Sequence, residues 1–188
     1  MPKTLLIALL SLILGLSSAC KFVISTYSET DKANTLVREG NALQLDGIRI
    51  QEEAADRYEQ IVKVRPRFED RTRLERPLEV VVFKLETARE KLNLSAEKTA
   101  EASKMDVSEV FKEYLTLRAG LLRREAEVTD ILVRQARLNY DPTLASEADF
   151  DQRWKALDAE IASIREQQTE IAAQADSILA EHDEEFEA

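Results

Sequence analysis

The strongest constraint on the fold is a regular pattern of residues in the last quarter of the chain. Its positions recur in alternating steps of four and three: Phe150, Trp154, Leu157, Ile161, Ile164, Gln168, Ile171, Ala175, Ile178 and His182. A sustained heptad of this kind is typical of a long helix that packs one face against another helix. We interpret Trp154 as a core anchor and Gln168 as a polar contact that sets the register. The same face could instead join two chains, as a homodimer through residues 150–182.

A second heptad pattern lies in the first third of the chain. A small residue recurs every seven positions, as the first member of the pairs Ala33-Asn34, Gly40-Asn41, Gly47-Ile48 and Ala54-Ala55. Each glycine inside a helix costs about 1 kcal/mol relative to alanine, which packing must offset. Small residues at one heptad position let a second helix approach closely. We therefore predict one helix over residues 30–64.

The stretch GNALQLDG, residues 40–47, permits an alternative interpretation. Together with Ala54, Tyr58 and Pro66, it resembles a degenerate tetratricopeptide repeat with a turn at Asp46-Gly47. Such a chain would be a peptide- or protein-binding module. The pattern occurs only once, whereas about three stacked copies are needed to bury the faces of such repeats.

The central part of the chain predicts two more helices. Pro66 and Pro77 bracket a break, and apolar residues at helical spacing follow from Leu78 to about residue 104. A further pattern occupies residues 107–136.

Two short signals bound that third helix. Asp106 and Glu109 stand at the spacing of a new helix cap. The sequence NYDPT, residues 139–143, is a turn that ends in a proline stop.

Composition agrees with these helices. The chain is 44% hydrophobic and 33% charged, and it has only four glycines and four prolines among 188 residues. Such a composition is typical of long helices. The sequence therefore predicts an all-α fold: an elongated antiparallel up-down bundle or coiled coil of about four long helices, over residues 30–182. Residues 183–188 form an acidic tail, which we expect to be disordered.

The first 19 residues have the pattern of a secretory signal peptide. A short positive head is followed by an apolar run from Leu5 to Leu16 and by small residues. The run is shorter than the ~20 apolar residues that a membrane span requires.

The residues Leu16, Ser18, Ala19 and Cys20 resemble the lipobox of a bacterial lipoprotein precursor, although Ser17 stands where that pattern usually has its aliphatic residue. The resemblance implies that Cys20 is lipidated and becomes the first residue, with residues 20–29 as a tether. Because Lys21 follows, it also implies the outer membrane, facing the periplasm. Ser17-Ser18-Ala19 also suits an ordinary signal peptidase, which would leave Cys20 unlipidated.

The sequence shows few residues that could perform chemistry. It has one histidine and one cysteine, and no phosphate-binding loop, catalytic elbow or zinc-ligand spacing. We expect no catalytic residues, no metal and no cofactor, and therefore no enzyme. The net charge of −10 argues against nucleic acid as a partner.

One segment runs against this acidic charge. Residues 63–76, the basic segment, hold six cations, of which we consider five as partner contacts: Arg65, Arg67, Arg71, Arg73 and Arg76. In an up-down bundle anchored at Cys20, this segment would lie at the end far from the membrane, beside the turn at residues 139–143. It is either an internally paired, solvated loop or a contact for an anionic protein or cell-wall partner. The sequence thus favours a structural, spacer or adaptor role.

Overall fold

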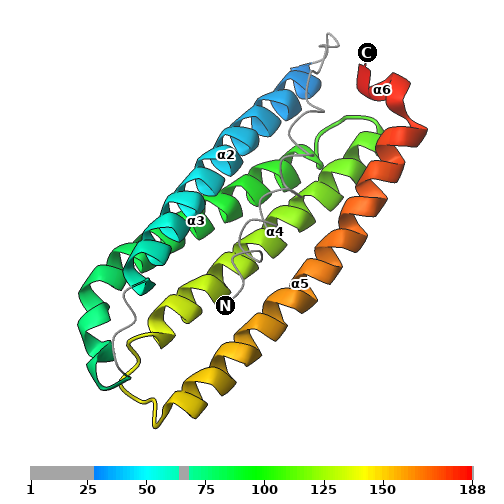
Figure 1. Ribbon diagram of the computed structural model, residues 1–188. Coiled ribbons are helices and arrows are strands. Elements are labelled where there is room, and N and C mark those ends of the chain that lie inside the picture. Colours follow the sequence, from blue (N-terminus) through cyan, green and yellow to red (C-terminus); the bar gives the residue numbers. More distant parts are fainter. Residues whose placement is uncertain (1–27, 64–67, 188) are drawn as a thin grey trace.

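The computed structural model describes residues 28–63 and 68–187, and these residues are mostly helical. The elements follow in the order α2 (Ser28–Val62), η2 (Phe68–Leu74), α3 (Glu75–Ala102), α4 (Glu109–Leu138), α5 (Glu147–Glu181) and α6 (Asp183–Glu187). The four long helices run up and down in turn and form an elongated bundle (Figure 1). Each long helix packs mainly against the next one in the sequence. The prediction of an all-α up-down bundle of about four helices is confirmed.

The first long helix is continuous. α2 extends for 35 residues and remains helical through Asp46-Gly47. The prediction of one helix over residues 30–64 is therefore confirmed within two residues at each end. A tetratricopeptide-like repeat would need a turn at Asp46-Gly47, and the prediction of that turn is wrong.

α2 and α3 meet through small side chains. The small-residue seam consists of four buried α2 residues at heptad spacing: Ala33, Gly40, Gly47 and Ala54. A Cβ atom added to Gly40 would lie 3.2 Å from Thr99 Oγ1, and one added to Gly47 would lie 3.2 Å from Leu92 Cγ. The Gly47 atom would also lie 3.3 Å from the Ala88 carbonyl oxygen, which belongs to the backbone. The predicted close approach of a second helix is confirmed.

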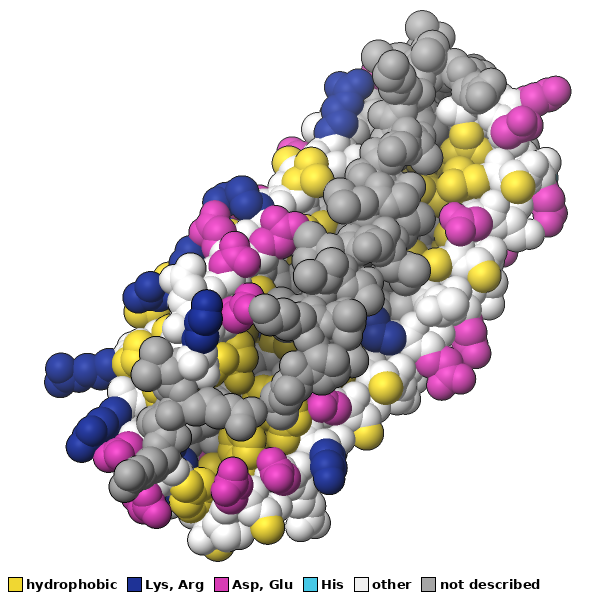
Figure 2. Space-filling view, viewed as in Figure 1, with side chains coloured by type: hydrophobic (Ala, Val, Ile, Leu, Met, Phe, Trp, Pro, Cys, Tyr) yellow, Lys and Arg dark blue, Asp and Glu magenta, His cyan; other side chains and the backbone are white. Residues whose placement is uncertain are grey.

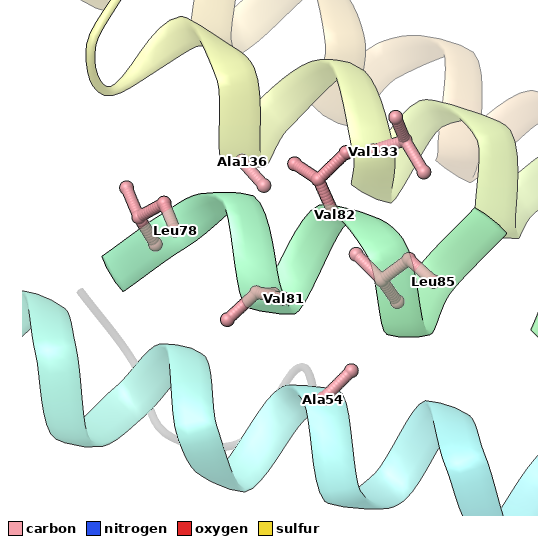
Figure 3. Packing of buried hydrophobic residues seen from close by; sticks show 7 residues of the cluster. All are labelled: Ala54, Leu78, Val81, Val82, Leu85, Val133 and Ala136. Carbon is pink, nitrogen blue, oxygen red and sulfur yellow. The ribbon is translucent and has the colours of Figure 1, made fainter. Parts of the chain in front are cut away.

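α3 lies between two neighbours, so its apolar face is buried from both sides. Figure 3 shows Ala54 of α2 on one side of α3, and Val133 and Ala136 of α4 on the other. Val81 lies on the α2 side and Val82 on the α4 side, and both are almost fully buried. This double contact makes α3 the central helix of the bundle.

The starts of the later helices differ in detail from the sequence-based prediction. α4 is capped by Ser108, whose hydroxyl accepts a hydrogen bond from Phe111 N at 3.2 Å. The predicted cap at Asp106 and Glu109 is wrong, because Ser108 has the non-helical backbone that a cap requires. α3 begins two residues before Pro77, in a first turn where a proline leaves no helical hydrogen bond unmade.

The C-terminal residues are also more ordered than we expected. Asp183–Glu187 form the short helix α6. The Phe186 ring lies 6.0 Å from the Phe111 ring and 5.3 Å from the Tyr114 ring, centroid to centroid. The expectation of a disordered tail is wrong for residues 183–187, because one aromatic side chain among the acidic ones reaches the core.

The heptad face of α5 packs against α4. Leu157, Ile161, Gln168 and Ala175 are buried, and the other predicted members of the pattern are half-buried. Trp154 stacks on Phe150 at 5.5 Å and packs against the cluster between α4 and α5, as a core anchor should. A homodimer through this face would require α5 to leave α4.

Candidate functional site

The basic segment and the α4–α5 connection meet at one end of the bundle, which we call the tip (residues 68–76 and 139–146). Figure 1 shows η2 and the loop before α5 at the same end, opposite the start of α2. Arg71 joins the two parts: its Nε donates to the Asp141 carbonyl at 3.2 Å and its Nη2 donates to the Leu144 carbonyl at 2.7 Å. Its guanidinium group also lies 3.9 Å from the centre of the Phe68 ring. The prediction that these two loops lie side by side is confirmed.

The structure therefore divides the five predicted contact residues. Arg71 points inward and fixes the tip, while Arg73 and Arg76 are exposed. The Arg73 side chain is 80% exposed and pairs with Asp70 at 3.1 Å, an arrangement that contributes little to stability and leaves the guanidinium accessible. Arg65 and Arg67 lie outside the described residues, as does Cys20.

The α4–α5 loop is held by its own polar contacts. The Asp141 carboxylate accepts hydrogen bonds from Thr143 N at 2.8 Å and from Thr143 Oγ1 at 2.7 Å. These bonds, and the nearby Arg153, lower the pKa of Asp141. The pKa of Asp149 is also lowered, first by the Ala145 N–H and then by Arg153. Figure 2 shows side chains of both charge signs at this end of the molecule.

A second polar feature lies in the middle of the bundle. Glu125 of α4 is only 3% exposed and accepts hydrogen bonds from two neighbouring helices. Gln51 Nε2 of α2 lies 3.1 Å from Glu125 Oε1. From α5, Arg165 Nη1 lies 2.6 Å and Gln168 Nε2 lies 3.2 Å from Glu125 Oε2. We call these four residues the polar hub; it joins three helices through one carboxylate.

A related contact lies one heptad before the hub. Arg118 of α4 is also buried, and its Nη2 donates to Asn41 Oδ1 at 2.5 Å and to Gln44 Oε1 at 3.2 Å. Seven residues separate Arg118 from Glu125 and Gln44 from Gln51. This equal spacing fixes the register between the parallel helices α2 and α4.

The same spacing continues to the end of α2. Tyr58 lies seven residues after Gln51, and Asn139 Nδ2 donates to its hydroxyl oxygen at 3.1 Å. Burial raises the pKa of Tyr58 to about 12, so the phenol remains neutral at physiological pH. These polar contacts position helices. Their donors and acceptors pair with one another except for Arg165 Nε, which is buried without a hydrogen-bond partner among the described residues.

Sequence reasoning found only part of this network. Gln168 was predicted as a register-setting polar contact, and its hydrogen bonds to Glu125 and Arg165 confirm that prediction. Glu125 was missed. A usable signal exists, because Glu125 interrupts the apolar face of α4 between Leu122 and Val128.

Within residues 28–63 and 68–187, no group of three or more His, Cys, Asp or Glu side chains is placed to hold a metal ion. In the same part of the chain, none of the helices is sufficiently long and apolar to span a membrane. No family model matches the chain, and searches of curated proteins and of solved structures found no similar protein.

Proposed function

We propose that this chain is a lipid-anchored, non-catalytic protein of the cell envelope that acts as a spacer or adaptor. In this proposal residues 1–19 are removed, Cys20 carries the lipid, and the protein faces the periplasm from the outer membrane. The pattern of Leu16, Ser18, Ala19 and Cys20 supports the anchor.

The observation that carries the proposal is the unbroken course of α2. This helix starts eight positions after Cys20 and its 35 residues rise about 50 Å. The tip lies at the far end of the same helix (Figure 1). An anchor at Cys20 would attach the lipid within eight residues of the start of α2, and the tip would lie at the opposite end of that helix, as a spacer requires.

The partner would meet the exposed cations of the tip. Arg73 and Arg76 are exposed there, and Arg65 and Arg67 belong to the same basic segment. These charges suit an acidic protein face or the carboxylates of a cell wall. Arg71 would act indirectly, by holding η2 against the α4–α5 loop.

The anchor is tested by the intact mass of the protein extracted from membranes. We expect the mass of residues 20–188 plus acyl groups, and we expect Cys20→Ser to release the protein from the membrane fraction. An unmodified mass for residues 20–188 would contradict the lipid anchor.

The adaptor role is tested by crosslinking in cells from a photoreactive residue at position 69, which is exposed in η2. We expect one reproducible adduct, and we expect the double change Arg73→Gln and Arg76→Gln to reduce it strongly. Arg38→Gln, at the opposite end of α2, is the matched control and should leave the adduct unchanged. Equal recovery from both variants would exclude the tip as a charged contact.

A further inference from the structure

The outward face of α3 carries three exposed apolar side chains. Val80 is 49%, Phe83 is 69% and Leu94 is 39% exposed. Spacings of three and eleven residues place them on one face of the helix. The core residues of α3 that contact α2 and α4 occupy the opposite face. Phe83 belongs to no core cluster of the described residues, and most of its side chain remains accessible to solvent.

The two flanks of this apolar face differ in charge. On one flank, three lysines at heptad spacing pair with carboxylates of α2 at 2.5 to 2.8 Å, in the pairs Lys84–Glu53, Lys91–Asp46 and Lys98–Glu39. The positive charges on this flank are therefore balanced within the chain.

On the other flank, Glu79, Glu90 and Glu97 are exposed. Glu79 accepts a hydrogen bond from the Tyr140 hydroxyl, which leaves its negative charge in place. Among the described residues, Glu90 and Glu97 form no ion pair. This flank is an acidic row beside an uncovered aromatic ring.

We propose that the outer face of α3 docks a basic amphipathic helix of a partner protein. The partner's apolar residues cover Val80 and Phe83, and its Lys or Arg side chains lie along Glu90 and Glu97. Large aromatic side chains at an interface centre are the usual anchors of binding. The net charge of −10 opposes a second copy of this chain and favours a basic partner.

This docking surface lies along the side of α3 and adjoins the tip at one end, where Glu79 accepts a hydrogen bond from Tyr140 and the exposed Arg76 lies one turn before Val80. It is independent of the proposed function, because it requires neither the lipid on Cys20 nor the arginines of the basic segment. A failure of the anchor or of the tip contact would leave it unaffected.

The test places a photoreactive residue at position 87, which is half-buried on the same face, in the full chain expressed in its native cells. We expect an adduct whose attached peptide has apolar residues at helical spacing flanked by Lys or Arg. Phe83→Ser should reduce this adduct about thirtyfold, the loss expected for an anchor residue. Leu45→Ser is the matched control: Leu45 is 56% exposed on α2 and its replacement should change nothing.

A charge test separates this surface from unspecific attraction to an acidic protein. The double change Glu90→Lys and Glu97→Lys should reduce the adduct, whereas Glu113→Lys with Glu166→Lys, two exposed sites elsewhere, should not. Three results would overturn the proposal: an adduct with a second copy of the chain, an adduct insensitive to Phe83→Ser, or no adduct from a probe shown to be reactive. All these sites except position 87 are exposed, and unchanged circular dichroism would confirm that the variants fold.

Discussion

The two edge helices of the bundle are attached by different physical means. α2 meets α3 through the small-residue seam, where the backbones approach so closely that a Cβ atom at Gly47 would crowd a backbone carbonyl. α5 meets α4 through large apolar side chains with the polar hub at their centre. The α2–α3 contact requires small side chains on α2. The α4–α5 contact requires that Arg165 balance the buried charge of Glu125.

The two contacts should therefore tolerate different substitutions. A close-packed seam resists added atoms, because added volume must displace backbone. A buried charge resists the loss of its partner, because the remaining charge is left without compensation. The first two predictions apply each contact's unfavourable change in turn, and the next two concern smaller effects on helix packing and on ion pairs.

The largest effect should follow from Glu125→Ala. The change leaves Arg165 half-buried without its carboxylate partner, and breaking a buried pair from one side costs about 3–5 kcal/mol. Urea unfolding followed by circular dichroism measures this loss. Glu127→Ala, which removes an exposed partner of Arg124 on the same helix, is the control and should cost under ~1 kcal/mol. Equal costs for the two variants would show that the hub contributes no more than a surface ion pair.

Gly47→Leu should have the next largest effect. The new side chain would meet Leu92 and the Ala88 carbonyl within the small-residue seam, and overpacking of this kind costs about 1–3 kcal/mol. The same unfolding measurement applies. A variant as stable as the natural protein would mean that α2 and α3 can separate without loss.

Gly120→Ala should act in the opposite direction. A Cβ at Gly120, on α4, meets only Ile171 Cδ1 at 3.9 Å, which is an ordinary contact. The change should stabilise the protein by about 0.5–1 kcal/mol, because alanine favours the helix. Destabilisation would show that α5 lies closer to α4 than the structure has it.

The smallest effect concerns the ion pairs beside the small-residue seam. Lys84 lowers the pKa of Glu53 below its ordinary 4.5, and Lys91 lowers the pKa of Asp46 below its ordinary 3.8. A carboxyl with a lowered pKa stabilises the fold above its unfolded pKa, and this contribution is lost as pH falls through the folded pKa. A carboxyl NMR titration should therefore show Glu53 titrating below 4.5, and Lys84→Gln should move it upward. No movement would mean that the pair is absent in solution.

The fold could be predicted largely from periodicity, whereas of the polar hub only Gln168 could be predicted. The spacing of Gly40 and Gly47 predicted a close helix neighbour, since small residues at one heptad position have few other uses. Glu125 interrupts the apolar face of α4, but that position does not reveal Gln51 and Arg165 as its partners. These partners lie 74 and 40 positions away in the sequence, and no local pattern joins them.

The role of Arg71 at the tip could not be predicted from the sequence either. Arg71 belonged to a run of arginines that the sequence presented as equivalent. Its inward direction depends on the carbonyls of Asp141 and Leu144, which only the assembled bundle brings near. Lipidation of Cys20 and contact through Arg65 and Arg67 remain predictions, because those residues lie outside the described part of the chain.

The most direct test of the contrast between the two contacts is amide hydrogen exchange, resolved by helix, in Glu125→Gln. This change keeps the side-chain shape and removes the charge that balances Arg165. We expect faster exchange in α5, while α3 and the small-residue seam remain as protected as in the unaltered protein. An equal acceleration over all four long helices would contradict this expectation, because the bundle would then open as one unit whichever contact is weakened.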